Sequence, residues 1–541
     1  MFVFDIGLFP LVFPFIFGSA PTRVGAEFFC VFISLVNIVA IDYNYKIRIS
    51  NKICREFTNI KYRKKARKMT HKRHSFSGSV GFVLAAAGSA VGLGNIWRFP
   101  YLAAKDGGGL FLIVYLILAI TFGYTLLISE VSIGRLTKQS PLTAYNKAKP
   151  GKIWKGLGIL ACIVPFIIMP YYCAIGGWVL KYTTAYVSGG ITKVSGSKGF
   201  ENFFGSFIGH PWWPIVFTVI FILATSFVVY KGVNAGIERL SKVLMPILLV
   251  LIIGIAIFAL TIHGDEGTGI DGIKTYLIPN FKGLTVTKFM GVVSDAMGQL
   301  FYSISVAMGI MIAYGSYLKD KENLVSAVNK IELFDTLVAF LAGAMIIPAV
   351  VAFMGPEKMQ ATAGPGLMFN ALPEVFSEMG TAGLIVGAIF FVTVLFAALT
   401  SSISILEAVV SSLMDKFKWS RKKAVVVETV IALFLGVVVC LGFVEGSPFN
   451  FKNLTLPNGS EGAQILDIFD YVSNSILMPI VAIGTCIFVG WIIKSKVIEG
   501  EATKNGEKFG RRHMYRVMVK YIAPILLAIL LLTAFGFNFG A

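Results

Sequence analysis

Helix-breaking and polar residues interrupt the first long apolar stretch of the chain, in the segment GSAVGLGNIWRFP from Gly88 to Pro100. Closely spaced glycines weaken a helix there, and Pro100 lacks an amide donor. Irregular backbone is tolerated inside a membrane only where it lines a cavity or is buried in protein. Asn95 and Arg98 are costly at that depth unless they have a function. We therefore interpret the segment as a discontinuous helix whose free amides and carbonyls bind ions and a polar solute.

A plainer interpretation of this segment is a kinked helix whose glycines let a neighbouring helix pack closely. That interpretation leaves Asn95 and Arg98 without a role. A second break is indicated by GQLFYSISVAMG, Gly298 to Gly309, where polar side chains lie in mid-span between glycines. Its plainer interpretation is ordinary serine back-bonding in a helix. Interrupted helices at corresponding positions of two halves are instead typical of a transporter binding site.

The composition predicts a membrane protein built of helices. Of 541 residues, 56% are hydrophobic, and the mean hydropathy is +0.76. Several apolar runs reach the ~20 residues needed to cross a bilayer. The formal net charge of +19 does not indicate nucleic-acid binding, because the basic residues cluster between apolar runs. Such clusters are typical of loops on the cytoplasmic side of a membrane.

Motifs of disulfide frameworks and of enzymes are not evident in the sequence. The six cysteines show no paired spacing, and the last four lie in apolar stretches: Cys30, Cys54, Cys162, Cys173, Cys440 and Cys486. We expect neither a disulfide framework nor a metal site built on them. HExxH, GxSxG and phosphate-loop motifs do not occur in a plausible context, which argues against an enzyme.

Apolar length predicts about eleven spans, of which the first and the sixth are broken. They lie near residues 80–104, 110–136, 156–187, 213–230, 241–262, 286–317, 324–353, 380–414, 423–444, 465–493 and 517–537. Basic loops alternate with loops that carry acids, glycine and asparagine, among them 263–282 and 445–463. We therefore expect a multi-pass protein of the plasma membrane with a cytoplasmic N-terminus of this core and an outer C-terminus. The sequons at Asn453 and Asn458 fall on the outer face.

Residues 1–68 differ from the rest of the chain. Their apolar runs are short or broken by Pro10 and Pro14, and the basic run KYRKKARKMTHKR follows them. A signal peptide has its charge before the apolar region, so this order argues against one. Either the segment is an added anchor or translation begins at Met69, and we favour the second. The recognisable domain is then 69–541.

The motifs that follow Met69 resemble those of the neurotransmitter:sodium symporter family, in its prokaryotic amino-acid branch. GSAVGLGNIWRFP is followed in register by KDGGGLFLIVY, SEVSIGR, GQLFYSIS, LFAALTSSIS and LDIFDY, so the similarity runs from about Arg73 to the eleventh span. The resemblance implies an all-α fold of two inverted five-helix repeats with discontinuous helices 1 and 6, and a sodium-coupled amino-acid symporter that works by alternating access. The family is a known example of such repeats, so the repeat pattern is not independent evidence. Members often have a twelfth span, whereas this chain is expected to end after the eleventh.

By resemblance, oxygen ligands from both breaks would hold two sodium ions. The first site would use the Ala90 carbonyl and the side chains of Asn95, Ser303 and Asp335, completed by the substrate carboxylate. The second site would use the carbonyls of Gly88, Val91 and Ala397 and the hydroxyls of Thr400 and Ser401. For these two hydroxyls, helix packing is the plainer interpretation.

Asp335 departs from the family pattern, which more usually has asparagine there. Chloride-dependent members bind chloride between that residue and a serine one turn later, where this chain has Ala339. Tyr115 and Gln299 match other positions of the chloride site. A carboxylate within the membrane is usually functional, and the plainer interpretation is a structural ion pair with a lysine or an arginine. We expect Asp335 to replace chloride, so that transport does not require the anion.

The resemblance also implies a substrate pocket. Tyr172 and the amides of Leu93 and Gly94 would bind the substrate carboxylate, the amides at the positive end of a half-helix. Amine-transporting relatives carry an aspartate at the position of Gly92, so its absence favours amino acids over monoamines. The side-chain pocket would be lined by Ile168, Tyr302, Ser305, Met308 and Ile405, and Ala90 and Ser303 of the first sodium site would also contact the substrate. Mostly apolar walls imply an apolar or aromatic amino acid, to which Met308 can adapt its shape.

Two ion pairs would act as gates by the same resemblance. Arg98 and Asp470 match the outer pair, and Arg73 and Asp415 match the inner pair. Phe76 and Tyr317 would support the inner pair. A plainer interpretation of Arg73 is a basic residue that flanks the membrane.

A sensor of amino acids or a ligand-gated ion conductor on the same fold is the alternative to a symporter. Accumulation of labelled amino acid against its gradient separates the two. The sequence leaves open which amino acid is bound, the ion stoichiometry and the oligomeric state.

Overall fold

The computed structural model describes residues 75–361, 364–451 and 454–537. The chain divides into two compact units, 1–73 and 74–541. The predictions for residues 1–68 lie outside the described residues, and so do Cys30, Cys54, Arg73 and Asn453. The second unit consists of helices and one two-stranded ribbon, β1 (His263–Gly264) with β2 (Gly267–Thr268).

The first half of this unit contains the predicted first broken span. It consists of α4 (Ser79–Ala90), the π-helical turn η1 (Gly94–Arg98) and α5 (Phe99–Lys105), and the two parts are bent by 54°. The other spans of this half are built from α6 (Gly109–Leu118), η2 (Ala119–Gly123), α7 (Tyr124–Thr137), α9 (Lys152–Val187), α11 (Trp213–Tyr230), η4 (Val233–Glu238) and α12 (Arg239–Leu260). Shorter elements lie between them: α8 (Pro141–Ala148), η3 (Gly190–Lys193) and α10 (Ser197–Ile208).

The second half begins with the other broken span, α14 (Val286–Ser303) and α15 (Ile310–Tyr317), after α13 (Gly269–Leu277). Its remaining spans are built from α16 (Leu324–Ala361), α18 (Gly380–Phe417), α19 (Arg421–Leu441), α20 (Ile465–Asp470), η6 (Tyr471–Leu477), α21 (Met478–Ile487), η7 (Phe488–Ile492), α23 (Arg512–Val517), η8 (Met518–Ile522) and α24 (Ala523–Ala534). The short elements are η5 (Leu367–Ala371), α17 (Leu372–Glu378) and α22 (Ser495–Ala502).

The predicted multi-span architecture is confirmed. Nine helices in the described ranges are long and apolar enough to cross a membrane, and the bent pair of the first span makes ten. The one predicted span outside this count is the sixth, the pair α14 and α15, which is less apolar because Lys288, Asp295 and Gln299 lie in α14. Several spans begin earlier than apolar length predicts, as at Lys152 and Arg512, because the helices continue into basic ends.

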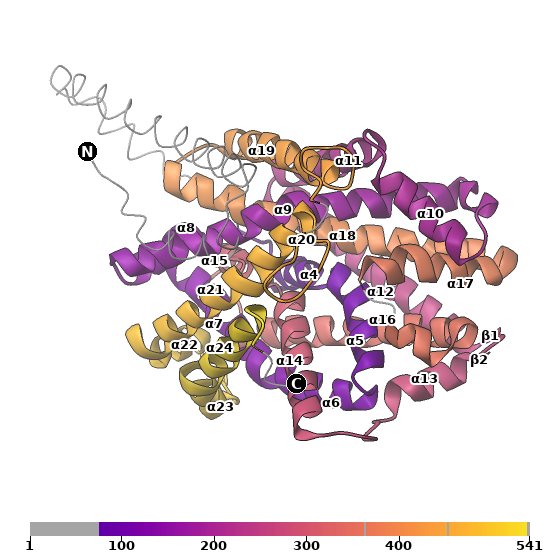
Figure 1. Cartoon of the computed structure of the whole chain (residues 1–541). Coiled ribbons are helices and arrows are strands. Elements are labelled where there is room, and N and C mark those ends of the chain that lie inside the picture. Colours follow the sequence, from indigo (N-terminus) through magenta and orange to yellow (C-terminus); the bar gives the residue numbers. More distant parts are fainter. Residues whose placement is uncertain (1–74, 362–363, 452–453, 538–541) are drawn as a thin grey trace, which may run out of the picture. The chain divides into compact units, whose positions relative to one another are not determined.

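The broken first span lies among other helices and not at their edge. α4 contacts α12, α16 and α18, and α5 contacts α16 (Figure 1). Its sequence SVGFVLAAAGSA is rich in alanine and glycine, and nine of its twelve residues are buried. Small side chains let neighbouring backbones approach closely in a membrane. This close packing brings residues from four helices to the break.

Candidate functional site

The first break leaves backbone carbonyls without helical partners. α4 ends at Ala90, and Val91 is extended at φ −73° and ψ 100°. The hydroxyl of Ser401 on α18 meets the freed carbonyls, donating toward the oxygens of Ser89 at 3.1 Å and Val91 at 3.2 Å. It also lies 3.4 Å from the oxygen of Gly88. The break is therefore a group of oxygens that face α18.

The second break has left-handed backbone at three positions, Ser305 (φ 54°), Ala307 (φ 62°) and Gly309 (φ 71°). Such conformations cost a non-glycine residue roughly 1–3 kcal/mol and persist only where the surroundings impose them. Glu130 on α7 is one such restraint, because its Oε1 accepts from the amide of Ala307 at 2.6 Å. Sequence reasoning missed Glu130, although a buried acid within the SEVSIGR motif was a usable signal.

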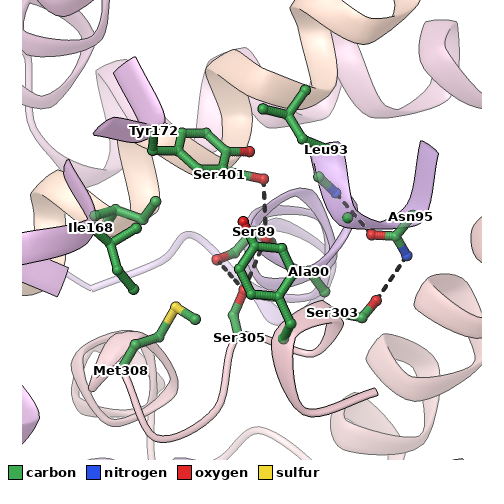
Figure 2. Close-up of a pocket in the computed structure, with 14 residues that line it drawn as sticks. Ser89, Ala90, Leu93, Asn95, Ile168, Tyr172, Ser303, Ser305, Met308 and Ser401 are labelled. Atoms are coloured by element: carbon green, nitrogen blue, oxygen red, sulfur yellow. Dashed lines mark hydrogen bonds between the residues drawn. The ribbon is translucent and has the colours of Figure 1, made fainter. Parts of the chain in front are cut away.

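A small cavity lies between the two breaks. All ten residues predicted to bind substrate line it: Ala90, Leu93, Gly94, Ile168, Tyr172, Tyr302, Ser303, Ser305, Met308 and Ile405. Gly92, Asn95, Ser401 and Ser89 complete the lining. Ser89 was not predicted, and its hydroxyl donates to Ser305 at 3.1 Å. Figure 2 shows apolar Ile168 and Met308 on one side of the cavity and polar Asn95 and Ser303 on the other.

Glycines allow side chains to approach the break. A Cβ on Gly94 would lie 2.6 Å from the ring of Tyr302. A Cβ on Gly92 would lie 2.9 Å from the Ser401 hydroxyl and 3.1 Å from the Tyr172 hydroxyl. The Tyr172 hydroxyl is buried without a hydrogen-bond partner within the described ranges, so a donor is available there to a bound carboxylate.

The four side-chain and backbone groups of the first predicted sodium site come from three helices. The Asn95 side-chain nitrogen donates to the Ser303 hydroxyl at 2.8 Å and to Asp335 Oδ1 at 3.0 Å. Ser303 donates to the same carboxylate oxygen at 2.8 Å. Asp335 is fully buried, and its Oδ2 has no partner among the described residues. Burying an unpaired carboxylate oxygen is costly, so a cation or a proton is needed there.

The residues of the second predicted sodium site also lie together. Ser401 contacts the Gly88 and Val91 carbonyls as described, and Thr400 donates to the Ala397 carbonyl at 3.1 Å. A Cβ on Gly88 would lie 3.3 Å from the Thr400 Cβ, so α4 and α18 are in contact here. Three carbonyls and two hydroxyls thus converge, which is a ligand set suited to a hard cation.

The positions that match a chloride site surround Asp335. Gln299 donates from its side chain to the Gly94 carbonyl at 3.1 Å, while its Oε1 and the Tyr115 hydroxyl have no partner in the described part of the chain. Ala339 is fully buried and supplies no polar group. The fixed negative charge in this group of side chains is that of Asp335.

The predicted outer gate is not a direct ion pair in this structure. Among the described residues no ion pair within 4.0 Å joins Arg98 to Asp470. Asp470 Oδ1 instead accepts from Asn474 at 2.5 Å, one helical turn away. Arg98 acts on Asp470 and Tyr302 at longer range. The two gate residues therefore face the same region without touching.

The predicted inner gate is only partly described, since Arg73 lies outside the described residues. Asp415 accepts from the amide of Ser140 at 2.6 Å. Phe76 is buried edge-on against the ring of Tyr317, with centroids 6.2 Å apart. The Tyr317 hydroxyl donates to Glu407 at 2.6 Å, so this aromatic pair is fixed to α18.

Comparisons with known proteins agree on one family. Residues 73–202 and 204–538 match the model of the sodium:neurotransmitter symporter family. An uncharacterized sodium-dependent transporter of Bacillus subtilis is 32% identical, with 85% of this chain and 97% of that protein covered. A second such transporter, from Haemophilus influenzae, is 33% identical, with coverages of 85% and 98%. Among solved structures, that of MhsT in complex with L-phenylalanine matches with a TM-score of 0.74 and 35% identity, over 85% of this chain and 100% of MhsT.

Proposed function

The chain belongs to the sodium:neurotransmitter symporter family, and we propose that it couples the inward movement of sodium to uptake of an amino acid by alternating access. The observation that carries the proposal is the free Oδ2 of Asp335, buried beside Asn95 and Ser303 at the edge of a cavity that two broken helices enclose. A cation at this oxygen would lie next to the substrate, so that each would favour binding of the other. Such mutual dependence is what coupling requires.

The cavity supports an amino acid as substrate, with an apolar or aromatic side chain. Its polar side offers the Tyr172 hydroxyl and the amides of Leu93 and Gly94 to a carboxylate. Its other side is lined by Ile168 and Met308, where an apolar side chain gains hydrophobic burial, and Ile405 also lines the cavity. The MhsT structure contains L-phenylalanine, which is of this class.

Two sodium ions would be carried with the substrate. In the first site the substrate carboxylate would join Ala90, Asn95, Ser303 and Asp335. Asn95 turns its amide nitrogen toward Asp335, so a cation there requires its amide oxygen to take that place. The second ion would take the oxygens of Gly88, Val91, Ala397, Thr400 and Ser401.

Asp335 would also make uptake independent of chloride. The ionised Asp335 carboxylate would balance the charge of the neighbouring sodium. In chloride-dependent relatives, a bound chloride ion has this role. When sodium leaves, burial favours the neutral acid, so a proton would be carried outward as the empty carrier returns. The pairs Arg98–Asp470 and Arg73–Asp415 would act as the outer and inner gates in this cycle. The core would lie in the plasma membrane with its N-terminus in the cytoplasm and its C-terminus outside.

A sodium-dependent binding screen of the twenty amino acids on purified protein tests the proposal. We expect one or a few apolar or aromatic amino acids to bind in sodium and not in potassium. Failure of all twenty to bind in sodium contradicts an amino-acid substrate. In proteoliposomes, accumulation against the gradient distinguishes a symporter from an amino-acid sensor or a ligand-gated conductor, neither of which concentrates its ligand.

A further inference from the structure

Three charged side chains lie together between the two half-helices, away from the cavity. Lys105 at the end of α5 contacts Asp295 on α14 at 2.6 Å and Asp106, which follows α5, at 4.0 Å. Both carboxyl groups therefore lie against the same ammonium nitrogen, and the charge of Asp295 acts on Asp106. One ammonium therefore serves two acids, and the group as a whole has one negative charge in excess when both acids are ionised.

Asp106 directly precedes a tight turn. The next two residues, Gly107 and Gly108, have φ values of 85° and 61°, and a Cβ on Gly108 would lie 2.2 Å from the carbonyl oxygen of Thr275. The amide of Asn280 donates to the Gly107 carbonyl at 3.0 Å. This tight turn fixes the backbone that follows Asp106.

The Asp106 carboxyl is nine-tenths buried, and its Oδ2 has no hydrogen-bond partner among the described residues. Asp295, by contrast, is 30% exposed and is neutralised by Lys105 at contact distance. Two carboxylates this close cannot both ionise easily, and they bind one proton between them at a raised pH.

We propose that Asp106 and Asp295 form a proton-binding site between α5 and α14, separate from the sodium and substrate sites, through which external pH acts on transport. When Asp106 is protonated, its carboxyl group can donate a hydrogen bond to Asp295. Lys105 keeps its ion pair with the Asp295 carboxylate. The two half-helices are then joined by a hydrogen bond and an ion pair. Loss of the proton replaces the hydrogen bond with repulsion between two carboxylates.

Asp295 and Lys105 are the charged groups that act on Asp106. On α5, Lys105 and Tyr101 are the further titratable groups, and Tyr101 acts on Lys105. On α14, Asp295 is the group that acts on Asp106. Lys105 acts on Asp106 in the opposite direction and lowers its pKa. Burial, and next the charge of Asp295, raise the pKa of Asp106 to about 7, which places the change within the physiological range.

Deprotonation of Asp106 has two opposite effects on sodium binding, and the stronger one decides the direction of the pH dependence. An extra negative charge also attracts sodium, but across solvent this attraction is screened within about 10 Å. Repulsion between a buried carboxylate and its neighbour acts at contact distance and is several times stronger. Ser303 of the first sodium site lies on α14, and Asn95 lies on η1, which continues into α5. Deprotonation should therefore loosen that site, and more sodium should be needed at alkaline external pH.

The test measures sodium-dependent uptake into proteoliposomes at external pH values from about 5.5 to about 8.5, with the internal pH held constant. We expect the sodium concentration for half-maximal uptake to rise roughly fivefold over this range in the wild type. Asp106→Asn keeps the shape of the side chain and a hydrogen-bond donor. Its sodium concentration for half-maximal uptake should therefore stay, at every pH, at the low value that the wild type has at acid pH. Asp295→Asn removes the repulsion and should move the response to lower pH. Asp271→Asn, on α13 at an exposed capping position, is the matched control and should keep the wild-type response.

A second readout does not depend on transport. Infrared spectra of the purified protein should contain a protonated-carboxyl band that titrates near neutral pH and is lost in Asp106→Asn. The uptake assay rests on the proposed function, whereas this band does not, so the two failures are distinguishable. An unchanged pH response of uptake in Asp106→Asn, or a band that survives the substitution, overturns the proposal. Asp335 remains in all three variants and cannot produce the difference between them.

Discussion

At the scale of single residues, the chemistry depends on a few buried oxygens that lack partners. Asp335 Oδ2 and the hydroxyls of Tyr172 and Tyr115 lie without hydrogen bonds in the described ranges, although each is buried. Groups of this kind are rare because each costs roughly 1–3 kcal/mol. Tyr172 lines the cavity, and Asp335 contacts Asn95 and Ser303 of its lining, so a bound substrate and ions would supply the missing contacts there.

Thr400→Ala should raise the sodium concentration needed for half-maximal uptake by about tenfold, because one oxygen ligand of a charged species is lost. The affinity for substrate at saturating sodium should change less. Thr393→Ala is a suitable control, since Thr393 is buried on the same helix and donates only to the carbonyl of Ile389. A sodium titration of uptake measures both, and an unchanged value for Thr400→Ala would remove this hydroxyl from the second site.

Replacement of the fixed charge should restore a need for chloride. The double variant Asp335→Asn with Ala339→Ser supplies a neutral amide and a hydroxyl beside Tyr115 and Gln299, so its uptake should require chloride. The wild type should transport equally well in chloride and in gluconate buffers. A wild-type protein that stops transporting in gluconate would show that Asp335 does not replace the anion.

At the scale of elements, the breaks are maintained by close packing from outside. A Cβ on Gly309 would lie 2.6 Å from the side chain of Pro141 and 2.8 Å from the carbonyl oxygen of Ala161. α8 and α9 therefore leave no space for a side chain at position 309 of the second break. The amide of Ala307, freed by the same break, depends on Glu130.

Gly309→Ala should lower the melting temperature and abolish uptake. The left-handed backbone costs a side chain roughly 1–2 kcal/mol, and overpacking adds about 1–3 kcal/mol. Gly156→Ala on α9 is the opposite case, because a Cβ there would have no neighbour within 4 Å. It should be neutral or stabilising by up to about 1 kcal/mol, since alanine favours a helix interior. Thermal unfolding in detergent measures both, and equal behaviour of the two variants would contradict this account.

At the scale of the whole unit, buried charges connect parts that are far apart in the sequence. Arg135 at the end of α7 is fully buried, and its Nε lies 2.7 Å from Glu501 on α22. The same guanidinium donates to the Glu322 carbonyl at 2.7 Å, in the segment between α15 and α16. One side chain thereby connects both halves of the transporter to the turn between the last two spans.

Glu501→Gln should destabilise the protein by roughly 3–5 kcal/mol, the usual cost of leaving one member of a buried pair unpaired. Asp271→Asn breaks the exposed pair with Lys274 and should cost at most about 1 kcal/mol. A fluorescence melting curve in detergent compares them. Similar losses in the two variants would show that burial of Arg135 does not matter for stability.

A chain that begins at Met69 should insert and transport as the full chain does, because the family match begins at residue 73. Uptake and surface labelling of the shortened chain measure this. A failure to insert would show that the early apolar segments form a membrane element.

Much of this protein could be predicted from its sequence, because the responsible physics is local. A bilayer demands long apolar helices, so the spans are visible as apolar runs, and the two breaks are visible as glycine and polar residues within them. The ten pocket residues were predicted through motifs matched to a family, and they line one cavity.

Tertiary structure decided which side chains meet. Asp106 and Asp295 are separated by 189 positions, and no local pattern relates them until α5 packs on α14. Glu130 reaches Ala307, and Arg98 faces Asp470 without touching it, for the same reason. Hydrophobicity and helix propensity act between near neighbours in the chain, whereas contact distances of a few ångströms arise only from packing. The protein's membrane class and binding chemistry are thus determined locally, and its proton-binding pair and gate geometry are determined by the fold.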